Sequence, residues 1–74
     1  MEEDKKRKRL KGGIYIHPKD IQVLNDCSIQ QARLEHRTIR DILGVDVKKL
    51  TVFAYCRYYK INYFLVISYL NPYR

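Results

Sequence analysis

Glutamine and arginine side chains recur along one face of a helix that the sequence predicts for residues 29–43. Gln30, Arg33, Arg37 and Arg40 follow one another at steps of three and four residues, which stacks them on one side of an α-helix. Amides and guanidiniums are the groups that hydrogen-bond base edges in the major groove of DNA and the phosphates beside it. This face is therefore a candidate nucleic-acid contact, and a merely solvated basic face is the alternative interpretation.

The neighbouring face of the same helix is suited to packing. Its residues are spaced in the same way, at steps of three and four, but lie roughly 100° around the helix from the first face. They are Ile29, Ala32, His36, Ile39 and Leu43. Ser28 and Gln31 are spaced as a capping box that begins the helix, and Gly44 is suited to end it. The predicted helix thus has one side that can pack against a core and an adjacent polar side that can contact a partner.

A shorter helix should precede this one. Pro18 suits the first helical position, Asp20 places a carboxylate in the first turn, and Ile21 and Leu24 give the helix a buried side. Residues 25–27 then form a turn before the longer helix begins. A short helix, a three-residue turn and a longer helix are typical of a helix-turn-helix, whose second helix enters the major groove.

The charge of the chain favours a polyanionic partner. The 74 residues carry a net charge of +7, of which +3 comes from residues 1–11 and +4 from the rest. Residues 1–13 are highly charged and end in two glycines, so we expect a disordered basic arm that follows a DNA backbone or enters a minor groove. Residues 14–74 then form one small domain.

Several classes of protein are disfavoured. No stretch approaches the roughly 20 apolar residues of a spanning helix, and no signal peptide is visible, so we expect a cytoplasmic protein without membrane contact. Cys27 and Cys56 lack the spacing of metal ligands, as do His17 and His36, so we expect buried thiols and no metal or cofactor. The absence of a phosphate-binding loop or a nucleophile–base pair argues against an enzyme.

The C-terminal part is predicted to form two more helices. Thr51 can cap the first, in which Val52, Tyr55, Cys56 and Tyr59 form a helical stripe. Asn62 can cap the second, which should end at Asn71–Pro72. We therefore predict an all-α domain of about four helices. A winged helix with a C-terminal hairpin is the alternative, because the aromatic and β-branched content of residues 63–70 also suits a strand.

Six of the seven tyrosines lie within residues 55–73. Large side chains of this kind fill a small core, or they stack on the bases of single-stranded nucleic acid or RNA. Apolar surface left over on the last helix would favour a homodimer. The residues predicted for that contact are Tyr63, Phe64, Ile67 and Tyr69.

Two blocks of residues carry a family resemblance. The first block consists of Pro18, Asp20, Ile21, Leu24, Ser28, Ala32, Ile39, Arg40, Leu43 and Gly44. The second block consists of Leu50, Thr51, Val52, Tyr55, Cys56, Tyr58, Tyr59 and Ile61. In these blocks the chain resembles small bacterial helix-turn-helix proteins of mobile elements, related in motif to excisionase-like and MerR-like domains. Asp26 stands where that family usually has glycine, and aspartate is among the residues that tolerate a left-handed conformation.

The resemblance implies DNA binding without catalysis. We accordingly expect sequence-specific binding of double-stranded DNA, as a transcriptional regulator or a recombination accessory factor. The alternatives are a protein-interaction module that uses the tyrosine-rich last helix, and an RNA binder. The expected base contacts are Gln30, Gln31, Arg33 and Arg37, and the expected phosphate contacts are Lys19, Ser28, Arg40, Lys48, Lys49, Arg7 and Arg9.

Overall fold

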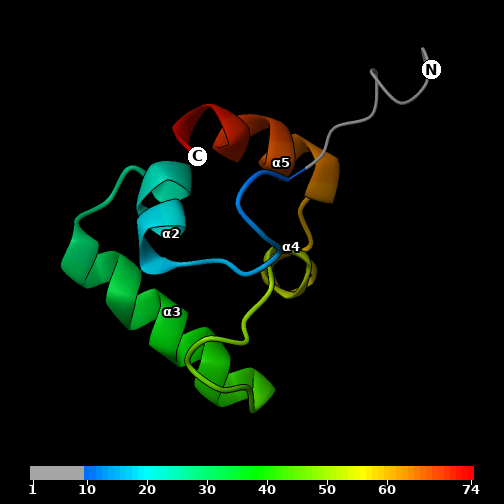
Figure 1. Ribbon diagram of the computed structural model, residues 1–74. Coiled ribbons are helices and arrows are strands. Elements are labelled where there is room, and N and C mark those ends of the chain that lie inside the picture. Colours follow the sequence, from blue (N-terminus) through cyan, green and yellow to red (C-terminus); the bar gives the residue numbers. More distant parts are fainter. Residues whose placement is uncertain (1–9) are drawn as a thin grey trace.

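A computed structural model describes residues 10–74, and the regular elements of this part of the chain are all helices (Figure 1). In chain order they are α2 (Pro18–Asn25), α3 (Ile29–Leu43), α4 (Val52–Tyr59), α5 (Tyr63–Leu70) and a terminal 3-10 turn (Asn71–Tyr73). The predicted all-α domain is confirmed. The alternative hairpin is wrong, because residues 52–59 and 63–70 form helices.

The predicted caps explain where these helices begin. Ser28 Oγ accepts a hydrogen bond from the Gln31 N–H at 3.1 Å, and Asn62 Oδ1 accepts one from the Leu65 N–H at 3.0 Å. Thr51 caps α4 in the same way, through Ala54. Each cap supplies an acceptor to a backbone donor that the helix itself leaves without a partner.

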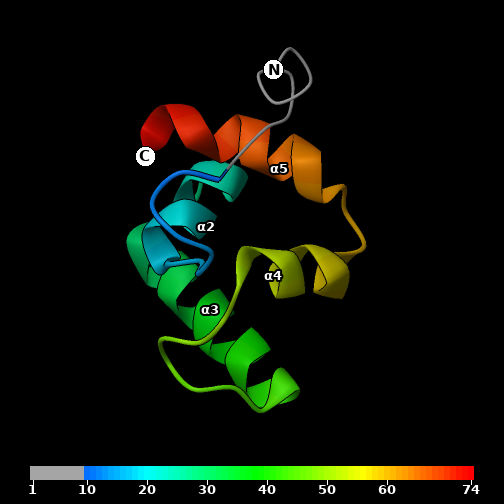
Figure 2. The ribbon, with the colours of Figure 1, turned by 45° about the vertical axis from the view of Figure 1, so that its right-hand side comes forward.

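The helices surround an extended segment at the centre of the fold. Figures 1 and 2 show α3 and α5 on opposite sides, with α2 and α4 between them. The extended segment of residues 14–16 pairs with the residues around the start of α4. The Ile16 N–H donates to Leu50 O at 2.8 Å, and the Val52 N–H donates to Ile14 O at 2.8 Å. These bonds tie the start of the domain to its middle.

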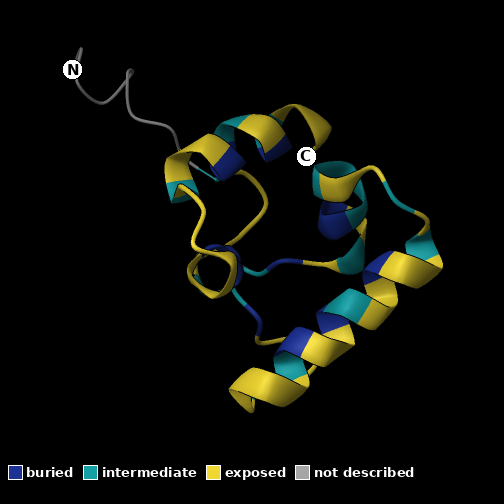
Figure 3. Cartoon of the chain, turned by 180° about the vertical axis from the view of Figure 1, so that it is seen from behind, coloured by how far each residue is buried: buried dark blue, intermediate teal, exposed yellow. Residues whose placement is uncertain are grey.

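The core is assembled from every element that surrounds this segment, and Figure 3 shows the buried positions on their inner sides. Its buried apolar members are Ile16, Ile21, Ala32, Ile39, Leu50, Val52, Tyr55, Cys56, Val66 and Leu70. Two predicted packing residues do not belong to it, since Leu43 and Tyr59 are each 42 % exposed. Leu43 lies in the last turn of α3, a 15-residue helix that extends past its 8-residue partner α2.

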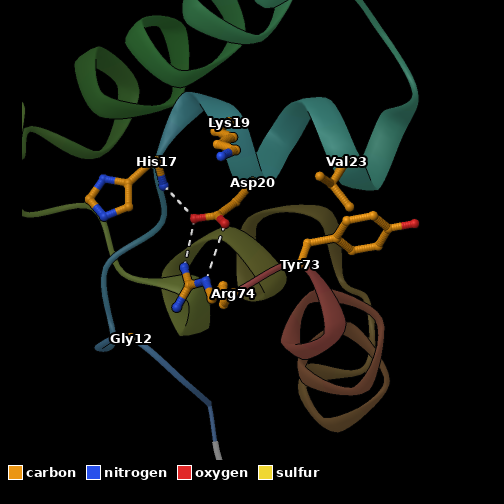
Figure 4. Close-up of a pocket in the computed structure, with 7 residues that line it drawn as sticks. All are labelled: Gly12, His17, Lys19, Asp20, Val23, Tyr73 and Arg74. Atoms are coloured by element: carbon orange, nitrogen blue, oxygen red, sulfur yellow. Dashed lines mark hydrogen bonds and ion pairs between the residues drawn. The ribbon is translucent and has the colours of Figure 1, made fainter.

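An ion pair that the sequence did not predict joins Arg74, which follows the terminal 3-10 turn, to Asp20 in α2 (Figure 4). Arg74 donates to both carboxylate oxygens of the buried Asp20, at 2.6 and 3.2 Å. Its remaining N–H groups donate to the backbone oxygens of Lys11, Gly13 and Tyr15, at 2.6, 2.8 and 3.0 Å. A guanidinium has five N–H donors, and these five hydrogen bonds use all of them.

Residues 10–13, which the sequence assigns to the arm, therefore belong to the packed domain. Leu10 packs against the core, and the Lys11 N–H donates to Asn71 Oδ1 at 3.0 Å. Sequence patterns missed this because the partners of residues 10–13 lie about 60 positions away. The expected disorder of residues 1–9 lies outside the described residues.

Candidate nucleic-acid interface

A tight turn sets α3 against α2. Asp26 ends α2 in the left-handed conformation, with φ 52° and ψ 50°, and its N–H donates to Gln22 O. Asp26 thus adopts the left-handed conformation that aspartate tolerates at this turn position. Only two residues, Cys27 and Ser28, separate it from the first residue of α3. The two helices consequently pack directly on each other, as a helix-turn-helix requires.

The predicted polar face of α3 is open to solvent over most of its length. Gln30, Gln31, Arg33 and Arg37 are exposed, while Ala32, His36 and Ile39 on the other side of the helix are buried. The four side chains predicted to reach base edges therefore share the outer surface of one helix. Burial of the opposite side holds that helix in place.

An apolar side chain that the sequence reasoning overlooked lies among them. Leu34 is 62 % exposed and follows Gln30 by four residues, so it lies one turn further along the same outer surface. An apolar side chain at such a position can contact the methyl group of thymine. The spacing of Leu34 from Gln30 was the signal available in the sequence.

Arg40 differs from the other arginines of this face because it is half-buried and anchored. Its Nε donates to His36 Nδ1 at 2.9 Å, and His36 Nε2 donates to the backbone oxygen of Ile16 at 2.9 Å. Burial lowers the pKa of His36, and the nearby positive charge of Arg40 lowers it further, outweighing the opposite effect of the Ile16 hydrogen bond. A neutral imidazole with its proton on Nε2 fits both bonds. The hydrogen bond to His36 therefore fixes the position of the Arg40 guanidinium.

Two of the predicted lysine contacts lie on the loop next to this anchor. Lys48 and Lys49 are exposed in the loop between α3 and α4, and Lys49 Nζ lies 5.9 Å from the centre of the Tyr15 ring. Tyr15 precedes the residue to which His36 binds, so Lys49 and Arg40 border the same extended segment. Lys19 is exposed in the first turn of α2. The predicted contacts Arg7 and Arg9 lie outside the described residues.

The opposite edge of α3 is occupied by a structural cluster around Glu35, which the sequence reasoning also missed. The Glu35 carboxylate accepts hydrogen bonds from Asn25 Nδ2 at 3.1 Å, Tyr55 OH at 3.3 Å and Tyr59 OH at 2.5 Å. Burial, reinforced by the Glu35 charge, raises the pKa of Tyr55 to about 12. Glu35 thereby links α3 to both α2 and α4, and its charge is directed away from the arginine edge.

The surface predicted for a homodimer needs one correction. Phe64 and Tyr69 are 63 % and 52 % exposed and Tyr63 is half-buried, but Ile67 is only 2 % exposed and cannot contact a partner. Ile67 faces the interior with Val66 and Leu70. The sequence could not decide this, because α5 is apolar around its whole circumference.

Comparisons with models of protein families, with curated proteins and with solved structures found no match to this chain. Among residues 10–74, no helix is long and apolar enough to cross a membrane. The same residues contain no group of three or more histidine, cysteine, aspartate or glutamate side chains arranged to hold a metal ion.

Proposed function

We propose that the protein binds double-stranded DNA by inserting α3 into the major groove. The observation that carries this proposal is the exposed edge of glutamines and arginines on a capped 15-residue helix that directly follows a tight turn. Gln30, Gln31, Arg33 and Arg37 would reach base edges, since Arg pairs with guanine and Gln with adenine through two hydrogen bonds each.

Phosphate contacts would hold the helix in register. Lys19 is exposed in the first turn of α2, Arg40 lies in the last turn of α3, and Lys48 and Lys49 are exposed in the loop that follows α3. The Ser28 hydroxyl oxygen already caps α3, so only its proton is left to donate to a phosphate. Contacts of this kind fix orientation without reading sequence, and the net charge of +7 supports them.

The biological setting follows from the same proposal. A module that occupies DNA without catalytic groups would act as a transcriptional regulator or as an accessory factor in recombination. It would act where DNA lies, which is the cytoplasm in the bacterial families that the sequence resembles.

The decisive experiment selects duplexes from a random pool and then compares variants on the selected sequence. Arg33→Ala and Gln30→Ala should each lower discrimination between the selected and a scrambled duplex by a factor of ten or more, because each bidentate pairing with a base contributes roughly 1–3 kcal/mol of discrimination. Arg57→Ala removes the same charge from an exposed position on α4 and serves as the matched control.

Equal discrimination by Arg33→Ala and Arg57→Ala, with helix content unchanged in circular dichroism, would refute the assignment of α3. The titrations should include single-stranded DNA and RNA. A preference for either over the duplex would favour stacking on the exposed tyrosines and would contradict the proposal.

The contribution of the N-terminal cations is tested by removing residues 1–9 and no more, because Leu10 and Lys11 pack against the domain. The removed segment holds five cations, Lys5, Lys6, Arg7, Lys8 and Arg9. Its removal should weaken binding to all duplexes alike and flatten the dependence on salt, by about one unit of slope for each phosphate that the shortened chain no longer neutralises. An unchanged slope would show that these residues do not contact DNA.

A further inference from the structure

The start of the α4–α5 pair repeats the start of the α2–α3 pair at a distance of 34 residues, although α5 has 8 residues and α3 has 15. α2 and α4 are both eight residues long, and both end in a left-handed residue: Asp26 (φ 52°, ψ 50°) and Lys60 (φ 58°, ψ 45°). Two residues later a polar side chain caps the following helix, Ser28 in one case and Asn62 in the other. The α4–α5 pair is thus a second unit with the same turn as α2–α3.

Burial follows the same correspondence. Three pairs of positions 34 residues apart are buried in both units, whatever their chemistry, although the exposed Arg33 corresponds to the buried Ile67. These pairs are Ile21 with Tyr55, Ala32 with Val66, and His36 with Leu70. The two units therefore turn equivalent faces toward the common core, and α5 occupies the place in its unit that α3 occupies in the first.

The outer faces of these two equivalent helices have opposite chemistry. Gln30 and Gln31 of α3 correspond to Phe64 and Leu65 of α5, which are 63 % and 69 % exposed. Residues 63–70 contain no charged side chain. α5 thus lacks the amides and cations with which α3 can contact a nucleic acid, and it presents apolar side chains to solvent instead.

We call the exposed apolar side chains on and beside α5 the α5 face. Its members are Phe53, Phe64, Leu65, Tyr69 and Tyr73. The Tyr63 ring joins Phe53 to Phe64, with ring centres 5.5 Å apart on each side, and Tyr69 stacks against Tyr73 at 6.4 Å. Each member is more than half exposed. The largest apolar patch on a monomer is roughly 300–600 Å² and often functional, so the α5 face is a candidate contact surface.

We propose that the α5 face binds the α5 face of a second copy of this chain, across a twofold axis. Large side chains that present 150–250 Å² each, when about half exposed, give a face on the order of 500 Å², which approaches the roughly 800 Å² that each partner contributes to a stable interface. A twofold contact places the same residues opposite one another. Because α5 carries no charge, this arrangement brings no like charges together on that helix.

Other occupants fit the α5 face less well. An anionic membrane or a nucleic-acid backbone would require cations on the helix, and α5 has none. Arg57, on α4, lies over the Phe53 ring at 6.0 Å. Residues 1–9 cannot supply an apolar cover from this chain, since Met1 is their single apolar side chain. A second copy remains the occupant with matching chemistry.

The test is sedimentation equilibrium of the full chain over a range of concentrations, without nucleic acid, so its outcome does not depend on the proposed DNA binding. The parent should form a dimer and no larger species. The double variant Phe64→Gln/Leu65→Gln, which restores the residue types of the first unit, should raise the dissociation constant by roughly 100-fold or more, because each change acts on both sides of the interface. Phe64→Lys should also prevent dimerisation, through like charges across the axis.

The matched control is Leu34→Gln/Ile42→Gln, which removes two exposed apolar side chains from α3 and should leave the dimer intact. Added salt should strengthen the dimer by screening the charge of +7 on each copy, whereas it weakens DNA binding. A parent that stays monomeric at all concentrations would overturn the proposal. A dimer that survives both α5 variants, with their helix content unchanged, would overturn it equally, as would binding of the monomer to anionic vesicles through this face.

Discussion

Replacing Arg74 by methionine should destabilise the whole domain, although Arg74 lies in none of its helices. The substitution keeps a long side chain of similar reach but removes all five N–H donors. Asp20, only 7 % exposed, would then be left with a single described hydrogen bond, from the His17 N–H at 2.8 Å. Three backbone oxygens between residues 11 and 15 would lose the guanidinium as well.

The size of the effect follows from the burial of the pair. Both side chains are about 10 % exposed, so solvent screens the pair only weakly. Removing one partner of a buried ion pair typically costs about 3–5 kcal/mol, because the other charge stays buried without compensation. A domain of this size has a total stability near the lower end of the usual range of roughly 5–15 kcal/mol. Arg74→Met should therefore bring the domain close to unfolding at room temperature.

A double-mutant cycle in urea, followed by circular dichroism, measures this directly. Asp20→Asn retains an acceptor for the His17 N–H, so Asp20→Asn/Arg74→Met should cost at least about 1 kcal/mol less than the sum of the single variants. Arg57→Met serves as the control, since an exposed cation contributes little to stability. If the free energies of unfolding of Arg74→Met and the control agreed to within about 0.5 kcal/mol, the ion pair would not stabilise the domain as proposed.

Two further predictions concern α3. Because the pKa of His36 is lowered by folding, its contribution to stability is complete above the ordinary value of 6.5 and should be lost progressively as the pH falls below it. His36→Gln, which can replace both hydrogen bonds without titrating, should flatten this part of a plot of unfolding free energy against pH; an unchanged slope would contradict the neutral His36. Ser28→Ala should cost about 1 kcal/mol and lower the melting temperature by roughly 4–8 °C. Ser28→Asp, which can accept the Gln31 hydrogen bond, should restore most of the stability, and an unchanged melting temperature for Ser28→Ala would show that the cap does not stabilise the helix.

The exposed chemistry of α3 could be predicted because it depends on periodicity. A helix with one apolar and one polar side has a single way to face a core, so Gln30, Arg33 and Arg37 had to be exposed once Ala32 and Ile39 were buried. The same reasoning could not work for α5. Because apolar residues lie on all its sides, periodicity offers no reason to bury Ile67 and expose Leu65, and the predicted homodimer surface is wrong at Ile67.

The sequence by itself determined the local structure of this protein. Helix limits, the caps at Ser28, Thr51 and Asn62, and the left-handed turn at Asp26 depend on residues within about four positions of one another, so their chemistry is visible in a short window of sequence.

Only the tertiary structure decided which distant groups meet. The partners in these hydrogen bonds are far apart in sequence. Arg74 and Asp20 are separated by 54 positions, His36 and Ile16 by 20, and Glu35 and Tyr59 by 24. Such pairs leave no periodic signal, because their geometry is set by how the helices pack and not by the spacing along any one of them. Packing also converted Arg40 from a free surface cation into an anchored one.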